Sequence, residues 1–417
     1  MNASTLPAFP SHADTDPRQL GWMQGFPPPA DKTIRFADGS YYEFPQRRWA
    51  FSHVRELLPT ACVSRGSGPV ALLPRAERDD LDAVAFTTLD GRAMTWGEAF
   101  AANYTDGVVV LHRGRVVYEK YFGALEAQRP HSAFSVTKSF VGTLAAMQVL
   151  AGALDETALV TRYVPELAGT AYGDATVRQV MDMIIGVKYS EAYADPKADI
   201  WAYAWAGGSR ARPPGYAGPA TFYDYLVTLQ KEGQHGSGFT YKTVNTEVLG
   251  WIIKRVAGAS LAELTSQLIW SKLGCEHDAL FQVDSVGTES GGGGLSTTLR
   301  DLARFGEAMR CDGAFNGQQI VPAGVVADIR RGANPAHFAS AGYSTLPGWS
   351  YRNMWWVAHD AHQCFTARGI HGQLIWVDPT AEMVVARYAS HPMAANAFLD
   401  PTSLPAYRAL AVQLMRA

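Results

Sequence analysis

Strand-like segments lie near both ends of this chain, and the region between them is mostly helical. Two β-rich runs, 107–111 and 115–121, are joined by a three-residue link that contains Gly114, a pattern typical of a β-hairpin. Further β-rich runs occur in the C-terminal quarter, at 354–357, 374–377 and 383–388. This order predicts an α/β (α+β) fold with a mostly antiparallel β-sheet, flanked by helices and interrupted by an inserted all-helical domain.

The same patterns divide the chain into three parts. Residues 1–45 are rich in proline, glycine and aromatic residues, and we expect an irregular arm that lies over a core. Residues 46–154 and 276–417 are expected to form the α/β domain with the antiparallel sheet. Residues 155–275 are expected to form the mostly helical domain, with a site between the two domains.

The composition argues against several classes of function. The 417 residues include 36 Lys and Arg and 39 Asp and Glu, so the formal net charge is −3 and no basic surface is expected to attract nucleic acid. The most apolar stretch is shorter than a membrane span, and the first residues lack the features of a secretion signal. We therefore expect a cytoplasmic protein that binds neither nucleic acid nor membrane.

No metal or cofactor site is predicted. The four cysteines are scattered without a C-x-x-C pair, which argues against a zinc site, a redox dithiol and a disulfide framework; they are Cys62, Cys275, Cys311 and Cys364. The eleven histidines show no metal-ligand spacing, and the P-loop and dinucleotide-binding motifs are absent. The G-x-S-x-G signal of α/β-hydrolases is also missing.

Ser135-Val136-Thr137-Lys138 is an S-x-x-K motif at the start of a helix predicted over about 135–150. Residues three apart share a helix face, so Ser135 and Lys138 are expected to be neighbours. A serine at a helix N-terminus lies among free backbone N–H groups, which suit an oxyanion, and a partly desolvated lysine can activate its hydroxyl. The alternative is an ordinary N-cap serine beside a solvated lysine.

Two later segments carry further candidate residues. Tyr241 lies at a loop-to-helix junction and is followed by small polar residues, which suits a general acid or base. The alternative is an exposed tyrosine beside a helix N-cap at Thr243. Gly369 and Gly372 lie at the start of a late strand, where the backbone can approach a ligand and a strand-edge N–H can complete an oxyanion hole. The alternative there is an edge strand kinked by glycine.

The order and spacing of these motifs resemble the serine β-lactamase/penicillin-binding-protein superfamily. The resemblance is closest to its class C-like esterases and amidases, and within them to the 6-aminohexanoate-dimer (nylon-oligomer) hydrolases. It covers roughly residues 45–395. The matching segments are Arg48 to Phe51, Phe134 to Gly142, Tyr163 to Gly169, Asp182-Met183, Tyr241 to Gly250, Asp301 to Arg304, Gly369 to Gln373 and Trp376 to Pro379.

The resemblance implies roles for the matching residues. Ser135 would be the nucleophile, Lys138 its base, and Tyr241 the group that relays a proton to the leaving group. The backbone N–H groups of Ser135 and Ile370 would form the oxyanion hole. The residues that would support the site or bind the substrate are Tyr193, Asn245, Gly369 and His371, and a structural role for His371 is equally compatible. The reaction would proceed through an acyl-enzyme.

Several departures from these relatives matter. The K-T-G strand of β-lactamases is absent, the usual Y-x-N reads Tyr241-Lys242-Thr243, and no export signal is found, so antibiotic and cell-wall substrates are disfavoured. Counted without gaps from Tyr193, the acidic residue that binds the substrate's amino end in nylon-oligomer hydrolases falls on Ala204. A carboxylate discriminates strongly in favour of an ammonium group. Other carboxylates that could replace it are those of Asp195 and Asp199.

We therefore expect a cofactor-free serine hydrolase that cleaves amide or ester bonds of small molecules, with a nylon-oligomer-type amidase as the first choice. The alternatives are a promiscuous short-chain carboxylesterase and a β-lactamase or D-aminopeptidase-like enzyme. A further alternative is a non-catalytic binding or sensor protein on the same scaffold, but a binding module needs no proton relay of the Ser135, Lys138 and Tyr241 type. The expected partner is the small-molecule amide or ester, and a homodimer is left open.

Overall fold

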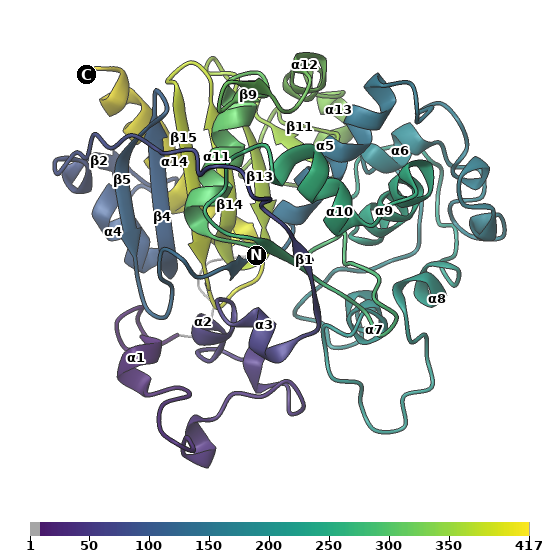
Figure 1. Cartoon of the computed structure of the whole chain (residues 1–417), viewed down its shortest axis with the longest axis horizontal. Coiled ribbons are helices and arrows are strands. Elements are labelled where there is room, and N and C mark those ends of the chain that lie inside the picture. The colour runs from purple at the N-terminus through teal and green to yellow at the C-terminus, as the bar shows by residue number, and fades with distance from the viewer. Residues whose placement is uncertain (1–8, 417) are drawn as a thin grey trace.

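The structure is a computed structural model, and it describes residues 9–416. Seven antiparallel strands form the main sheet, in the order β11-β12-β13-β14-β15-β4-β5. In that order they span Ser350–Arg352, Trp355–Val357, Phe365–Gly369, Gln373–Asp378, Met383–Ala389, Thr105–His112 and Arg115–Tyr121. Because β15 pairs with β4, the hairpin from the first third of the chain and the C-terminal strands share one sheet (Figure 1). The predicted fold class is confirmed.

Helices cover both faces of this sheet. Successive residues of a strand point to opposite faces, and α11 (Leu299–Arg310) and α14 (Asp400–Met415) use different faces. A Cβ built on Gly306 of α11 would lie 2.8 Å from Ile375 Cγ2, so this helix approaches the sheet more closely than a larger residue would allow. On the opposite face, the ring of Trp376 lies 5.3 Å from the ring of Tyr407 in α14.

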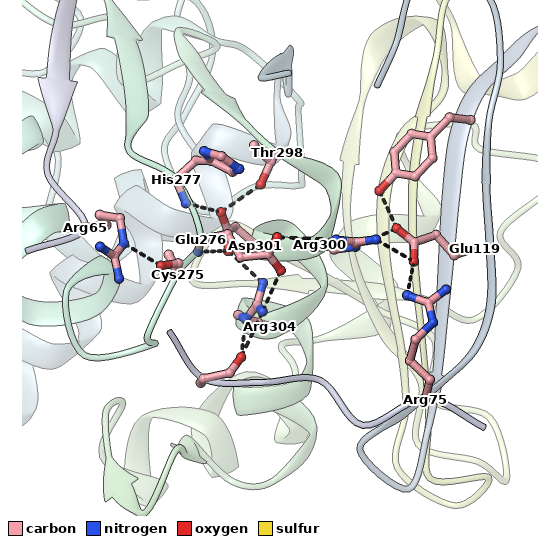
Figure 2. Close-up of polar contacts among 12 residues, drawn as sticks. Arg65, Arg75, Glu119, Cys275, Glu276, His277, Thr298, Arg300, Asp301 and Arg304 are labelled. Atoms are coloured by element: carbon pink, nitrogen blue, oxygen red, sulfur yellow. Dashed lines mark hydrogen bonds and ion pairs between the residues drawn. The ribbon is translucent and has the colours of Figure 1, made fainter. Parts of the chain in front are cut away.

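A buried polar network fixes the start of α11 (Figure 2). The Asp301 carboxylate accepts hydrogen bonds from the backbone N–H groups of Glu276 and His277, at 2.8 and 3.0 Å, and from the Thr298 hydroxyl at 2.7 Å. It also pairs with Arg304 at 2.9 Å, one turn later on the same helix. These bonds connect the segment that precedes β7 (Ala279–Gln282) to the helix that supports the sheet, and they explain why Asp301 and Arg304 occur together.

The middle of the chain is helical. Its helices lie together beside the sheet, in blue, teal and green in Figure 1. They are α5 (Val136–Leu150), α6 (Val177–Met181), α7 (Asp199–Ala206), α8 (Phe222–Leu226), α9 (Val244–Ala257) and α10 (Leu261–Thr265). The predicted helix at about 135–150 is therefore present as α5. It packs against both α9 and strand β13, so it joins the helices to the sheet.

A second sheet of four strands, in the order β1-β7-β8-β6, lies next to the start of α5. Its strands span Thr60–Val63, Ala279–Gln282, Leu295–Thr297 and His131–Ser132. β6 pairs with β8 through Ser132 and Ser296. This pairing brings the glycine run before β8 close to the residues that follow β6, which include Ser135. Two short hairpins complete the strands: β2 (Ala85–Thr87) with β3 (Ala93–Thr95), and β9 (Ala314–Phe315) with β10 (Gln318–Gln319).

The described part of the N-terminal arm is a set of short helices and turns around a small core of its own. Tyr41 and Ile34 are buried there, and Trp22 and Phe36 pack against them. The arm is purple in Figure 1 and lies across one end of the molecule. The remaining short helices are α1 (Pro17–Leu20), α2 (Arg47–Ala50), α3 (Val54–Leu57), α4 (Trp96–Ala102), α12 (Ala323–Arg331) and α13 (Pro335–Ala339). Within residues 9–416, no helix combines the length and apolar composition that crossing a membrane requires.

One local prediction needs correction. Gly369 to Gly372 does not begin a strand: Gly369 ends β13, Ile370–Gly372 is a tight 3-10 turn, and β14 starts at Gln373. The chain reverses here because His371 and Gly372 both have positive φ angles, 62° and 103°. Glycine adopts such angles readily and histidine does so at a cost, so the turn is not visible as a simple glycine-rich signal.

Candidate active site

Ser135 lies at the point where β6 turns into α5. It is the N-cap residue of the helix and lines a cavity between the helices and the sheet. The residue before it, Phe134, has a φ of 44°, in the left-handed region that non-glycine residues rarely occupy. This angle makes the chain turn sharply between strand and helix. Such strained residues occur often at functional sites.

Lys138 lies one helical turn after Ser135, and its side chain is almost entirely buried. Its ammonium group donates hydrogen bonds to the Ser135 hydroxyl oxygen at 2.9 Å and to the Gly292 carbonyl at 2.5 Å. Burial lowers the pKa of Lys138 to about 8, although the nearby carboxylates of Glu191 and Glu247 act in the opposite direction. The solvated lysine considered for this position is therefore excluded, and a neutral amine is accessible near neutral pH.

A glycine-rich loop holds the lysine in place. Glu247 of α9 accepts hydrogen bonds from the backbone N–H groups of Gly291 and Gly292, at 2.9 and 2.8 Å, and from the Tyr203 hydroxyl at 2.6 Å. A Cβ on Gly292 would lie only 2.4 Å from Thr243 Cγ2, so only glycine fits here. The buried carboxylate therefore fixes the loop whose carbonyl accepts a hydrogen bond from Lys138.

Tyr241 lies over the same pair of residues. The Lys138 nitrogen is 5.2 Å from the centre of the Tyr241 ring, and the ring stacks on Trp356 at 5.4 Å. Burial and the Glu191 carboxylate raise the pKa of Tyr241 well above its usual value, while a hydrogen bond with the Ser135 hydroxyl acts the other way. Tyr241 is therefore a protonated phenol in the resting protein, able to donate a proton.

Glu191 is a site residue that the sequence analysis missed. Its carboxylate accepts a hydrogen bond of 2.6 Å from the backbone N–H of Thr243, and it therefore holds the segment that carries Tyr241. Its charge also acts on Lys138 and raises that lysine's pKa. Burial raises the pKa of Glu191 itself. Glu191 lies 50 residues before Tyr241, and no local motif indicates that the two meet.

The turn after β13 lies against the start of α5. A Cβ built on Gly369 would be 2.6 Å from the Ala133 carbonyl and 3.1 Å from the Ser135 nitrogen, so glycine is required for this close approach. Ile370 lines the cavity together with Ser135. Within residues 9–416, no loop, cap or side-chain hydrogen bond uses the backbone N–H of either residue. Two free N–H groups are the arrangement that an oxyanion hole needs.

The cavity beside Ser135 has a volume of about 910 Å³, including its open mouth. Its wall is mostly aromatic and aliphatic, which is typical of a small-molecule site. The N-terminal arm contributes Tyr41 and Tyr42, α7 contributes Ile200, Trp201 and Ala204, and the segment after α7 contributes Arg210. The arm, which packs around a small core of its own, therefore also forms part of the cavity wall.

The supporting residues occupy different places. Tyr193 lines the cavity and packs edge-on against Trp201. Asn245 is fully buried in α9, where its side-chain oxygen accepts a hydrogen bond of 2.8 Å from the Tyr172 hydroxyl, and it makes no hydrogen bond to Lys138 or Tyr241 in the described structure. The resemblance implies that Asn245 supports Lys138 and Tyr241, and any such support does not come from a direct hydrogen bond in the described structure.

His371 is buried behind the cavity wall. Its Nδ1 lies 2.7 Å from the His391 carbonyl, which assigns the proton to Nδ1, so Nε2 accepts from the Tyr42 hydroxyl at 3.3 Å. Burial and the nearby Arg47 lower the pKa of His371 well below its usual value, and the ring is neutral. These contacts hold the turn after β13 against the N-terminal arm, which favours the structural interpretation of His371.

The carboxylates considered as replacements for an acid at position 204 lie elsewhere. Asp199 accepts a hydrogen bond of 2.8 Å from the backbone N–H of Ser190, and Asp195 accepts one of 2.9 Å from that of Lys197. Neither aspartate lines the cavity. Ala204 does line it, so the cavity wall has no carboxylate at this point.

One group of potential metal ligands occurs at the other end of β13, against the expectation that histidines and cysteines would form none. His362, Cys364 and Asp378 have donor atoms within 4.8 Å of one another. In the described structure, His362 Nδ1 and Asp378 form a hydrogen bond of 2.7 Å. The group lies apart from the cavity, and none of its members lines it.

Comparison with known proteins agrees with this arrangement. The β-lactamase family model matches residues 99–401. The chain is 36% identical over 354 residues to 6-aminohexanoate-dimer hydrolase from Paenarthrobacter ureafaciens, an alignment that covers 85% of this chain and 88% of that enzyme. A solved structure from Bacillus anthracis, assigned as a 6-aminohexanoate-dimer hydrolase, superimposes with a TM-score of 0.84 at 32% identity over 91% of this chain and 97% of the other.

A more distant structure shares the fold alone. EstCE1, a hydrolase with promiscuous acyltransferase activity, superimposes with a TM-score of 0.58 at 16% identity, over 74% of this chain and 96% of its own. The family match and the two closer relatives agree with the S-x-x-K geometry at the cavity. The chain therefore belongs to the β-lactamase family and is a serine hydrolase that acts on amide or ester bonds.

Proposed function

We propose that this enzyme hydrolyses small linear amides through an acyl-enzyme on Ser135, as an amidase of the 6-aminohexanoate-dimer-hydrolase type. The observation that carries the proposal is the 2.9 Å hydrogen bond from the buried Lys138 ammonium to the Ser135 hydroxyl, at the edge of an apolar cavity. A lysine whose pKa is lowered to about 8 can take the serine proton as the hydroxyl attacks a carbonyl carbon.

The remaining steps use the groups around this pair. The N–H groups of Ser135 and Ile370 stabilise the negative oxygen that forms on the attacked carbonyl. Tyr241, a protonated phenol, gives its proton to the leaving amine or alcohol and recovers one from Lys138. Water then attacks the acyl-enzyme, and the same groups act in reverse order to release the acid.

A short-chain carboxylesterase is the second candidate, and Ala204 favours it. The linear 6-aminohexanoate dimer carries an ammonium group on its acyl half, and the cavity wall of the described structure has no carboxylate to bind it. An ester with a good leaving group needs less binding energy from such a contact to react.

A side-by-side assay separates these candidates. One batch of enzyme is assayed on the linear 6-aminohexanoate dimer and on a p-nitrophenyl short-chain ester, with Ser135→Ala as the control. Dimer cleavage that is lost in Ser135→Ala supports the amidase. Ester cleavage alone, lost in the same variant, supports the carboxylesterase, and activity that persists in Ser135→Ala contradicts both.

The pH dependence of hydrolysis is expected to follow Lys138. The base must be neutral to accept the serine proton, so kcat/KM should rise with pH and level off above about 8, the pKa to which burial lowers Lys138. Glu191 raises that pKa, so Glu191→Gln should move the midpoint to lower pH. Steady-state kinetics between pH 6 and 10 test both points. A profile that falls over this range would exclude Lys138 as the base.

Asn396 is expected to act as a positioning residue for the oxyanion hole. Its side-chain amide donates to the Gly369 carbonyl at 3.2 Å. That carbonyl shares a peptide plane with the Ile370 N–H, so the bond fixes the direction of the N–H. Losing a whole oxyanion donor costs 10²–10³-fold in kcat, and losing only its orientation should cost about 3- to 10-fold.

The variant Asn396→Ala tests this role. We expect kcat to fall by that factor while KM changes little, because the oxyanion contact strengthens mainly in the transition state. Asn334→Ala is the matched control, since Asn334 caps α13 and does not line the cavity. A rise in KM with unchanged kcat would show that Asn396 does not position the hole.

Three further proposals follow from the sequence analysis, and they concern the division into domains, the location in the cell and the oligomeric state. Residues 155–275 form a helical domain separate from the sheet domain of 46–154 and 276–417, the enzyme is cytoplasmic, and it associates as a homodimer. Limited proteolysis, cell fractionation and light scattering at several concentrations test these proposals in turn. Rapid cleavage within either domain, a secreted product and a concentration-independent monomer are the results that would oppose them.

A further inference from the structure

The cavity beside Ser135 contains one charged side chain. Arg210 lines the cavity, and none of the Asp or Glu residues in the described part of the chain does. The wall at Ala204 is apolar, and the Arg210 backbone N–H donates to the Ala204 carbonyl at 3.2 Å. A cation therefore lies next to the position where a carboxylate would be needed to bind an ammonium group.

The guanidinium is held between two aromatic rings. Its central carbon lies 3.8 Å from the centre of the Tyr42 ring and 4.9 Å from that of the Trp201 ring. Stacking of this kind fixes the plane of the group and leaves its N–H edge free for a planar acceptor. The backbone nearby is also fixed, because the Tyr41 hydroxyl donates to the Ser209 carbonyl. The site is therefore ordered before any ligand arrives.

The Arg210 guanidinium has no counter-charge in residues 9–416. Within that range, its side chain takes part in no ion pair and no hydrogen bond, whereas the side chain of the nearby Arg212 donates to the carbonyls of Trp205 and Ala220. Arg47, whose guanidinium carbon lies 5.2 Å from the centre of the Tyr42 ring, donates a hydrogen bond to the Pro392 carbonyl at 3.0 Å. Burial is the main cause that lowers the pKa of Arg47, and the charge of Arg210 acts in the same direction, which shows that the two cations lie close enough to repel each other. Two guanidinium groups close to the same ring create a positive potential that an anion would relieve.

We propose that Arg210 is the binding site for a carboxylate on the acyl part of the substrate, so that the enzyme prefers amides and esters of dicarboxylic acids that keep one acid group free. This inference rests on the acyl-enzyme chemistry of the proposed function, and it replaces the 6-aminohexanoyl group as the preferred acyl group with that of a dicarboxylic acid. A carboxylate matches the guanidinium edge with two parallel hydrogen bonds. An ammonium group would be disfavoured next to Arg210, because the cavity wall offers it no carboxylate and the guanidinium would repel it.

The positions of Tyr241 and Arg210 indicate where the leaving group and the acyl chain of the substrate lie. Tyr241 gives its proton to the leaving group, and its ring packs on Trp356 and Tyr351, neither of which lines the cavity. The leaving group therefore lies toward Tyr241. Arg210 lies next to Tyr42 and Trp201 in the cavity lining. Because the leaving group occupies the region near Tyr241, the acyl chain extends into the cavity toward Arg210.

Three p-nitrophenyl esters with the same leaving group test the charge preference. They are the mono-ester of adipic acid, the same compound with its free acid blocked as a methyl ester, and the ester of 6-aminohexanoic acid. We expect kcat/KM for the free acid to exceed that of the methyl ester by about 10- to 100-fold, as for a hydrogen-bonded charge pair. The 6-aminohexanoate ester should be the poorest, and added NaCl should reduce the preference.

Variants assign the preference to Arg210. In Arg210→Met the ratio between free acid and methyl ester should fall to about one, whereas Arg210→Lys should keep part of it because the charge remains. Arg212→Met is the matched control: the Arg212 side chain binds the Trp205 and Ala220 carbonyls and does not line the cavity. This control should keep both the preference and the basal rate.

A binding measurement separates this inference from the catalytic proposal. Calorimetry with the wild-type protein should show that adipate binds more tightly than hexanoate, and that Arg210→Met removes the difference. If no ester is cleaved but adipate binds in this way, the proposed function fails and the anion site stands. Equal kcat/KM for free acid and methyl ester, or a preference that survives Arg210→Met, would overturn the anion site.

Discussion

Replacing Lys138 with alanine is expected to lower kcat for ester and amide hydrolysis by about 10⁴-fold or more. The variant removes the only group that hydrogen-bonds to the Ser135 hydroxyl oxygen from within the helix and that can accept its proton at accessible pH. Steady-state kinetics on a p-nitrophenyl ester measure the loss. Lys188→Ala is the control, because Lys188 is exposed and does not line the cavity, and it should keep full activity.

The double variant sharpens this test. Groups that act as one unit are not additive, so Ser135→Ala together with Lys138→Ala should lose no more activity than either single change. If the losses multiply instead, the two residues act independently and the shared proton transfer is excluded. Circular dichroism on all three variants shows that the fold survives, since the Ser135 hydroxyl has no structural partner other than the site residues.

Replacing Glu247 with leucine is expected to lower the free energy of unfolding by about 3–5 kcal/mol. The change removes the acceptor of four buried donors: the Tyr203 and Ser290 hydroxyls and the backbone N–H groups of Gly291 and Gly292. The Gly292 carbonyl that accepts from Lys138 would move as well, so kcat should fall with stability. Urea unfolding monitored by tryptophan fluorescence measures the first effect.

A matched glutamate shows whether the effect is specific. Glu232 is exposed, and its change to leucine should alter the unfolding free energy by less than about 0.5 kcal/mol. Unfolding of Glu247→Leu at the same urea concentration as the wild type would contradict the role of this carboxylate in holding the glycine loop.

The parts of the site that were predictable from the sequence are those set by local geometry. Ser135 and Lys138 meet because they are three positions apart on a helix, and an S-x-x-K motif at a helix start places the two side chains on the same face. The β-hairpin at 107–121 and the C-terminal strands were likewise readable from their alternation and turns. That they form one sheet was predicted because strand-like segments lie on both sides of a mostly helical region.

The parts that were not predictable depend on long-range packing. Glu191 and Glu247 reach Lys138 from different segments, and a buried carboxylate is not distinguishable in sequence from an exposed one. The reversal at Ile370 to Gly372 depends on a positive φ at His371, which histidine residues rarely adopt. Arg210 lines the cavity next to Tyr42 from the N-terminal arm and Trp201 from α7, and no sequence pattern indicates that these three residues meet.

The most direct test of the central claim, that Ser135 is the nucleophile of a serine hydrolase, is covalent labelling. The wild-type protein is treated with a serine-directed fluorophosphonate, and the modified peptide is mapped by mass spectrometry. A single adduct on Ser135, formed with loss of hydrolysis and absent from Ser135→Ala, is the expected result. Full inhibition with the adduct on another residue, or an unlabelled protein that still hydrolyses esters, would contradict it.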